Sequence, residues 1–507
     1  MLPPSALDRL PDAFVDLWQG VEDEILKDIA RRIAKTGTIT ETANWQLWRY
    51  QQTEALRNDV VKLLAKYSGK SDAAIRQLLL QAATEAMERE DAIYYHYGLE
   101  PTPFEESPAL NNLLDAGARQ TAGTWKNLTA TTANTVTGQF ERTLDAAWAK
   151  VSTGAFDYKT AVKQAVDSLA DGMKFVTYPT GHQDSIEVAA RRAILTGVNQ
   201  TAGKLQVARA DEMGVEFFET TAHGGARPSH AEWQGRQFHR GGAVDYMGKY
   251  YPDFEAATGY GTGAGLCGWN CRHTFFSIFP ELGAPPAWTQ ESLEALNARD
   301  IEYNGGRYTR YEISQMQRAR ERTVRKYKRR YLAEDAAGAD TTASAVKLRQ
   351  ARQELADFIS ATGGRADSAR TSVAGFGRSA SSKASFLARK QEHFDAANTE
   401  LQQMRENGII KSTGKLIEAP SAPNELIVNR DHVFQRMIER NMTLADCDKI
   451  IESSKVALSQ WNGGQTVYYS EQGFVAVRAN GVISTLGPLD EGGKKLMEVA
   501  KKHGIPH

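Results

Sequence analysis

Two groups of side chains in this 507-residue chain have the types and spacing to do chemistry. The first is a close set of thiols and imidazoles, Cys267, Cys271 and His273, with His230 or His239 available as a fourth member. Thiolates and imidazoles arranged as a tetrahedron are the usual ligands of structural zinc. The pattern therefore predicts a zinc site formed by Cys267, Cys271, His273 and His230.

Two other interpretations of this set stay open at the level of sequence. In the first, the glycine-rich loop holds no metal, its cysteines are buried as small apolar groups and its histidines bond to the backbone. In the second, a cysteine and a histidine form a catalytic pair, although no oriented base or oxyanion-binding group is recognisable nearby. The C-x-x-x-C-x-H spacing is not that of a common zinc finger, so it does not choose between zinc and a metal-free loop.

The second group lies near the C-terminus. His432, Arg436 and Arg440 recur every four residues, so they line one face of a predicted helix. An isolated stripe of this kind is usually an exposed helix face. A second polar cluster is predicted on the strands that follow, and together the two clusters could bind a phosphate.

The expected turns set the register of those strands. If Asn480-Gly481 is a two-residue loop and 471–473 a three-residue loop, the strands 466–470, 474–478 and 482–486 acquire one polar and one packed face. The polar face carries Thr466, Tyr468, Arg478 and Thr485. Tyr469 lies on the packed face, so one side of the sheet is core and the other a polar platform.

Helices must position the first group. Apolar residues at steps of three and four predict helices at 14–33, closed by Gly37, and at 45–64, 71–87 and 186–213. The last begins with a capping box, Asp184 and Glu187, and closes at Gly214. Strand-like runs at 215–221 and 274–279 flank the irregular Cys/His segment.

The chain is long enough for several domains. Residues 318–330 hold eight basic side chains; a solvated helix face is the preferred interpretation, and a contact to DNA or another phosphate backbone is the alternative. A Ser-, Ala- and Gly-rich stretch at 363–385 predicts a flexible linker, and Pro420 and Pro423 mark a break. We expect boundaries at 1–332, 333–423 and 424–507.

The fold class follows from these elements. A mostly α-helical N-terminal region contains a small α+β Cys/His segment, and a small α+β domain follows at the C-terminus. Helices at 431–440 and 443–451, strands at 456–460, 466–470, 474–478 and 482–486, and a helix at 493–503 give the order ααββββα, with the strands as an antiparallel meander.

Composition excludes several classes of protein. The 61 basic and 62 acidic residues leave no net field that would favour nucleic acid over the whole surface. Three cysteines are too few for a disulfide framework. We expect no signal peptide, because the first residues lack a basic segment followed by an apolar run, and no membrane partner, because no run is long enough to span a bilayer.

The Cys/His segment resembles the minor capsid proteins of tailed phages, the Mu F-like head morphogenesis group. The resemblance lies in Arg227-x-x-His230, in Gly235, and in Cys267-Gly-Trp-Asn-Cys271-Arg-His273. It extends from the first helices to about Leu332. It implies a structural protein of the virion, inside the head near the portal, with portal and capsid proteins as partners.

The last domain resembles the barnase/EndoU/colicin/RelE-like superfamily of small metal-independent ribonucleases. The resemblance lies in D-H-V-F-Q-R-M-I-E-R (431–440), in N-M-T-L-A-D after it, and in the meander that ends in V-I-S-T. It implies a toxin that needs no cofactor, in which a ribose 2′-OH attacks the adjacent phosphorus. A second histidine is not obvious, because His503 and His507 lie in the tail, so a two-histidine mechanism is in doubt.

The implied roles divide among six residues. His432 is the candidate general acid or base, the arginines offset charge on the phosphorane, and Tyr468 and Thr485 position the phosphate or nucleophile. The candidate catalytic set is His432, Arg436, Arg440, Tyr468, Arg478 and Thr485. We expect a head protein with a C-terminal ribonuclease that acts on RNA, and an immunity protein as a further partner. The alternative is a purely structural head protein whose tail domain binds portal, scaffold or DNA without catalysis.

Overall fold

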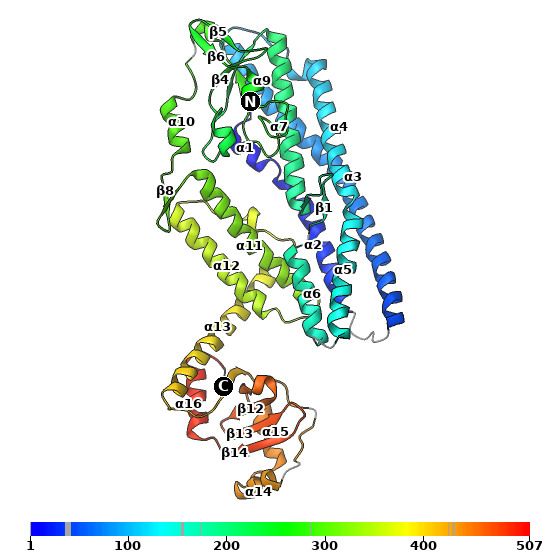
Figure 1. The fold of residues 1–507 in the computed structure, drawn as a ribbon, viewed down its shortest axis with the longest axis vertical. Helices are drawn as coiled ribbons and strands as arrows, with labels where there is room; N and C mark the ends of the chain where they lie inside the picture. The colour runs from blue at the N-terminus through cyan, green and yellow to red at the C-terminus, as the bar shows by residue number, and fades with distance from the viewer. Residues whose placement is uncertain are drawn as a thin grey trace. The chain divides into compact units, whose positions relative to one another are not determined.

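The computed structural model describes residues 2–35, 42–153, 157–172, 174–283, 285–423, 425–428 and 431–506. The chain forms two compact units, Met1–Arg378 and Ser379–His507 (Figure 1). The predicted helix cap Gly37 and the predicted domain start Asn424 lie outside the described residues. No helix in the described ranges has both the length and the apolar composition needed to cross a membrane.

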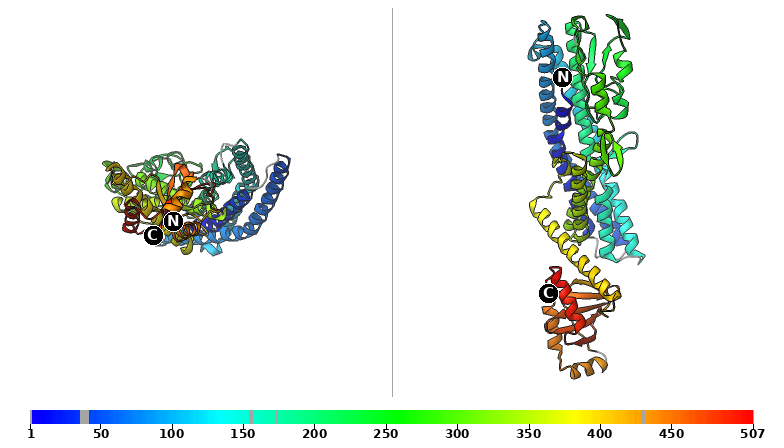
Figure 2. Two further views of the ribbon diagram at one scale, coloured as in Figure 1. Left: turned by 90° about the horizontal axis from the view of Figure 1, so that it is seen from below. Right: turned by 90° about the vertical axis from the view of Figure 1, so that its left-hand side faces the viewer.

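Long helices make up most of the first unit, and those between residues 4 and 213 pack around one apolar core that also includes Ala333. Figure 2 shows two further views of these helices. Trp18 and Trp125 meet edge to face at its centre, with 4.8 Å between ring centroids. The helices are α1 (Pro4–Arg9), α2 (Asp12–Ala34), α3 (Thr42–His96), α4 (Pro108–Ala130), α5 (Thr132–Ser152), α6 (Tyr158–Gly172), α7 (Ile186–Met213), α11 (Arg310–Ala336) and α12 (Thr342–Thr362).

Two sequence-based expectations about these helices are corrected. The separate helices at 45–64 and 71–87 are parts of α3, because no proline interrupts the segment between them. The N-cap of α7 is Ser185 rather than Asp184, since the Ser185 hydroxyl accepts the Val188 N–H at 3.3 Å. Gly214 does end α7, in the left-handed region at φ 68°.

Short elements carry the Cys/His segment. Strand β3 (Phe217–Thr220) lies between β4 (Gln237–His239) and β7 (Phe275–Ser277) in an antiparallel sheet, which confirms the two strands predicted around this segment. The other short elements of this unit are η1 (Phe104–Glu106), β1 (Val176–Thr177), β2 (Gln183–Asp184), α8 (Pro228–Ala231), β5 (Val244–Tyr246), β6 (Lys249–Tyr251), α9 (Phe254–Thr258), η2 (Pro280–Leu282), α10 (Gln290–Asn297), β8 (Ile301–Tyr303), β9 (Gly306–Tyr308) and η3 (Ala369–Thr371).

The basic run at 318–330 is not a solvated helix face. On α11, Arg329 lies 3.4 Å from a carboxylate oxygen of Glu22 and 3.1 Å from one of Asp23, and both acids are almost fully buried. Arg325 pairs with Glu187 at 3.1 Å. The preferred interpretation was wrong because helices α2 and α7 bring acids against this run, which the sequence of α11 alone does not show.

The predicted flexible linker is also corrected. Between α12 and residue 378 the chain packs along the first unit: Val373 is buried, and the Ala374 N–H donates to Asp23 at 2.7 Å. Gln19 donates to the carbonyl of Ser372 at 2.5 Å. Small polar residues therefore permit a close approach here rather than forming a mobile spacer.

The second unit has the predicted order ααββββα, with two further elements in front. They are α13 (Arg378–Glu406) and β10 (Lys415–Glu418), followed by α14 (Asp431–Glu439), α15 (Leu444–Ser453), β11 (Val456–Gln460), η4 (Trp461–Gly463), β12 (Gln465–Ser470), β13 (Gly473–Arg478), β14 (Ile483–Gly487) and α16 (Glu491–Lys502). The five strands form one antiparallel meander, β10-β11-β12-β13-β14. The structural division at Ser379 therefore precedes the expected boundary at 424, because α13 and β10 belong to the second unit's fold.

Both faces of this sheet are core, so the predicted polar platform is wrong. One face, with Val467 and Tyr469, packs against α13 and α16. The other, with Tyr468 and Val475, packs in a cluster with residues of α14 and α15. The turn after β12 holds two residues instead of three, because Ser470 pairs with Gly473.

Candidate metal centre and candidate nuclease residues

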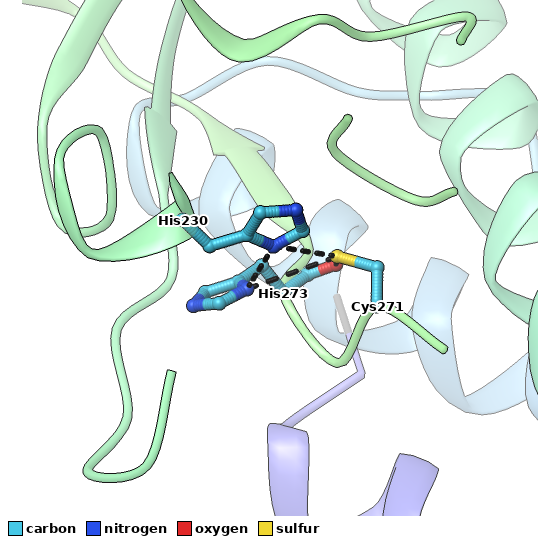
Figure 3. Close-up of side chains that lie close together, drawn as sticks. All are labelled: His230, Cys271 and His273. Carbon is cyan, nitrogen blue, oxygen red and sulfur yellow. Dashed lines mark hydrogen bonds between the residues drawn. The ribbon is translucent and has the colours of Figure 1, made fainter. Parts of the chain in front are cut away.

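Three of the four predicted metal ligands meet in the first unit (Figure 3). The Nδ1 atoms of His230 and His273 are 3.3 Å apart, and Cys271 Sγ lies 3.7 Å from each. His230 comes from α8, and the other two from the loop that precedes β7. Each of the three residues is 2% exposed. The cluster is therefore a buried group of one sulfur and two nitrogens.

The outer nitrogens of both imidazoles are also engaged. His230 Nε2 lies 2.9 Å from the carbonyl oxygen of Ala264, and His273 Nε2 lies 3.1 Å from Oε1 of Gln234. Asn199 on α7 donates to the carbonyls of Cys271 and His273, at 3.0 Å each. These hydrogen bonds hold the orientation of both imidazole rings and the backbone of the loop that carries Cys271 and His273.

Burial sets the protonation of this cluster. Desolvation lowers the pKa of His230 to about 4 and holds the pKa of His273 well below its ordinary value. The same burial raises the pKa of the Cys271 thiol. Burial therefore favours the uncharged form of both imidazoles, and a neutral imidazole is the form that offers a lone pair.

The other predicted ligand, Cys267, lies outside the cluster. Its side chain is buried among apolar residues, beside Tyr260, and its Sγ is 3.8 Å from the carbonyl oxygen of His273. The alternative fourth member, His239, lies on β4 and bonds through Nδ1 to the carbonyl of Gly242 at 2.7 Å. Spacing alone did not distinguish Cys267 from Cys271, because both occupy one short loop.

His223 was not singled out from the sequence. Its ring stacks on that of His273, with 4.4 Å between centroids and 29° between planes. Its Nε2 is buried and has no hydrogen-bond partner among the described residues. The sequence signal that could have identified His223 was its position, seven residues before His230 and next to a predicted strand.

In the second unit the structure brings together only part of the candidate catalytic set. Arg436 on α14 donates to the hydroxyl of Thr485 on β14 at 2.5 Å, and Arg440 donates to the carbonyl of Leu486. His432 is exposed on the same helix. Two arginines and a threonine therefore lie at the edge strand β14.

Tyr468 and Arg478 lie elsewhere. Tyr468 is 3% exposed in the core cluster that includes Val433, and its hydroxyl lies 3.4 Å from the carbonyl of Ser421. Arg478 pairs with Gln465 in the sheet, and its guanidinium is 6.0 Å from the ring of Trp461. The shared face predicted for these residues does not exist, because the shorter turn shifts β13 by one residue and so exchanges its faces.

Two exposed apolar side chains on α14 were not identified from the sequence. Phe434 is 60% exposed and Ile438 is 67% exposed. They are four residues apart, so they share a helix face, and that spacing was the signal that could have found them. We call Phe434 and Ile438 the apolar pair of α14.

Comparison with known proteins identifies the class of the first unit. The family description "Phage minor capsid protein 2" matches residues 2–360. A "Structural protein" of Lactococcus phage LL-H is 26% identical over 341 residues, which are 63% of this chain and 85% of that protein. No solved structure matches. The resemblance to phage minor capsid proteins is thereby confirmed, and the chain belongs to the phage minor capsid protein 2 family, a family of virion proteins.

Proposed function

We propose that the protein is a portal-proximal component of the phage head, and that its C-terminal unit is a module that binds another head protein through α14. The observation that carries the proposal is the exposure of the apolar pair of α14. Large apolar side chains that stay in solvent lose the free energy that burial would supply, and contiguous ones often mark an interaction site. The virion is the setting because the family consists of minor capsid proteins.

The polar residues beside the apolar pair support binding rather than catalysis. Arg436 and Arg440 already bond to the edge strand β14, and Tyr468 is in the core. An arginine-flanked apolar helix face is typical of protein interfaces, where arginines and aromatic residues are enriched. The partner we propose is therefore the portal or a capsid protein.

A double substitution of the apolar pair tests this function. In the full chain, Phe434→Ser with Ile438→Ser should weaken co-purification with the portal and capsid proteins of the same phage by at least about tenfold, because each side chain loses roughly 1 kcal/mol or more of burial. The matched control is Phe386→Ser, since Phe386 is 59% exposed on α13. Equal binding by the double variant and the control contradicts the proposal.

A metal-independent ribonuclease is the second candidate. It is favoured by the juxtaposition of Arg436 with Thr485, on the helix that also carries His432. Guanidinium groups stabilise a phosphorane, and histidine transfers protons near neutral pH. An immunity partner and toxicity to bacteria belong to this candidate, whereas a contact to packaged DNA belongs to the first.

The same preparations distinguish the two candidates. On the first, the full chain leaves RNA intact in EDTA, and His432→Ala changes nothing. On the second, the wild-type chain degrades RNA in EDTA, and His432→Ala or Arg436→Ala slows cleavage by about two orders of magnitude or more. Cleavage that disappears with His432 replaces the binding proposal with the nuclease.

A further inference from the structure

The geometry points to a zinc ion bound by His230 Nδ1, His273 Nδ1 and Cys271 Sγ in the first unit, and we propose this three-residue set as the metal site of the protein. It does not depend on the function of the C-terminal unit. The set excludes Cys267, although spacing had included it.

The distances between the donor atoms fit one metal ion. A tetrahedral zinc with nitrogens at about 2.0 Å and sulfur at about 2.3 Å separates two nitrogen ligands by about 3.3 Å and a nitrogen and a sulfur by about 3.5 Å. The two Nδ1 atoms are 3.3 Å apart, and Cys271 Sγ is 3.7 Å from each. Figure 3 shows the three side chains close together, with dashed lines between them.

Hydrogen bonding fixes which imidazole nitrogens carry protons. The carbonyl of Ala264 can only accept, so His230 Nε2 must donate to it. Gln234 Oε1 accepts the backbone N–H of His223 at 3.1 Å, which identifies this atom as the oxygen, so His273 Nε2 must donate as well. An imidazole that carries its one proton on Nε2 turns an unprotonated Nδ1 inward, and the hydrogen bonds of both rings select this tautomer.

A metal-free cluster leaves this arrangement unsatisfied. The thiol of Cys271 has one proton and can donate to only one of the two Nδ1 atoms. The second Nδ1 then faces another acceptor 3.3 Å away inside the core. A buried acceptor without a donor destabilises the folded state. A zinc ion displaces the thiol proton to solvent and binds the thiolate and both Nδ1 lone pairs at once.

The outer contacts have the form expected around a metal site. Histidine ligands commonly donate their second N–H to a carbonyl or amide oxygen, as His230 and His273 do here. Asn199 holds the carbonyls of Cys271 and His273 to α7. One sulfur and two imidazole nitrogens form a donor set suited to zinc rather than to magnesium or calcium.

The metal would cross-link two segments of the first unit. The loop before β7 and the short helix α8 are far apart in sequence and join at this cluster. Three protein ligands leave one tetrahedral position, and His223, stacked on His273, is the nearest additional histidine. A site of this form stabilises the folded state by the free energy of metal binding.

Metal content and cobalt spectra of the full chain test the site. The wild-type chain, dialysed against zinc and then against buffer, should retain about one zinc per chain. Cys271→Ser should lower the affinity for zinc at least about tenfold, whereas Cys267→Ser should retain it, because Cys267 packs among apolar residues. Gln234→Leu should weaken binding by about 10-fold to 100-fold with unchanged stoichiometry at saturation, as a positioning residue would.

Cobalt identifies the ligand atoms in the wild-type chain itself, because its spectrum reports a thiolate ligand and tetrahedral geometry. Wild-type chain loaded with Co²⁺ should show the visible bands of tetrahedral cobalt and a thiolate-to-cobalt charge-transfer band, and the latter should vanish in Cys271→Ser. Wild-type chain that binds neither Zn²⁺ nor Co²⁺, or a Cys267→Ser variant that loses metal as completely as Cys271→Ser, overturns the proposal.

Discussion

The two units differ in where their polar side chains lie. In the first unit polar groups enter the interior and satisfy one another, as at Asn199 and in the cluster of Arg329 with Glu22 and Asp23. In the second unit two apolar layers enclose the sheet, and His432 and Arg440 remain at the surface.

The difference shows which groupings of side chains could be predicted from the sequence. His230, Cys271 and His273 converge because two short segments meet, and neither segment depends on a register over several strands. The candidate nuclease set depended on the length of one turn, and a two-residue turn separates Tyr468 from Arg478. A change of one residue in a strand exchanges its faces.

The largest stability effect is expected at the buried ion cluster of the first unit. Arg329→Met leaves Glu22 and Asp23 buried without their cation, which should lower the free energy of unfolding by about 3–5 kcal/mol. Chemical denaturation of the full chain, followed by circular dichroism, measures it. Arg322→Met is the matched control, because Arg322 is exposed on the same helix, and it should change stability by less than about 0.5 kcal/mol.

This effect should depend on pH. Burial raises the pKa of Glu22 from 4.5 to about 7. A carboxyl with a raised pKa contributes stability that is fully present below pH 4.5 and is lost as the pH rises through about 7. The loss of stability caused by Arg329→Met should therefore be greater at pH 8 than at pH 5. An equal loss at both pH values would show that the charge of Glu22 is not its cause.

A smaller effect is expected at the tyrosines of the second unit. Tyr468→Phe keeps the buried ring and removes one long hydrogen bond to Ser421, so it should cost about 0.5–1.5 kcal/mol. Tyr469→Phe, on the other covered face, serves as the matched variant. Urea unfolding of residues 379–507 measures the free energy of unfolding of both variants. If Tyr468→Phe instead lost RNA cleavage with unchanged stability, the result would contradict this expectation and support a catalytic role for Tyr468.

Much of the fold was predictable because its signals are local. The helix cap at Thr443, the αL residue Asn441 and the strand 456–460 all follow from residues within one turn or strand. The order ααββββα was predicted for the same reason. Strand β10 was missed, because its short segment pairs with a strand more than 35 residues later.

The sites were predictable only in part. The sequence identified His230, Cys271 and His273, and it could not exclude Cys267, because that decision depends on how the glycine-rich loop packs against α7. The acidic residues that pair with the basic run 318–330 could not be predicted for a similar reason. They are Glu22 on α2 and Glu187 on α7, and each lies more than 100 residues before the arginine that it pairs with.

Thermal unfolding with and without a zinc chelator tests the contrast between the units most directly. Chelation is expected to lower the unfolding temperature of the full chain's first unit by several degrees, because the metal binds only the folded state. No shift is expected for the separately prepared 379–507 unit. An unchanged transition of the first unit after complete removal of zinc, or an equal shift in both units, would contradict this expectation.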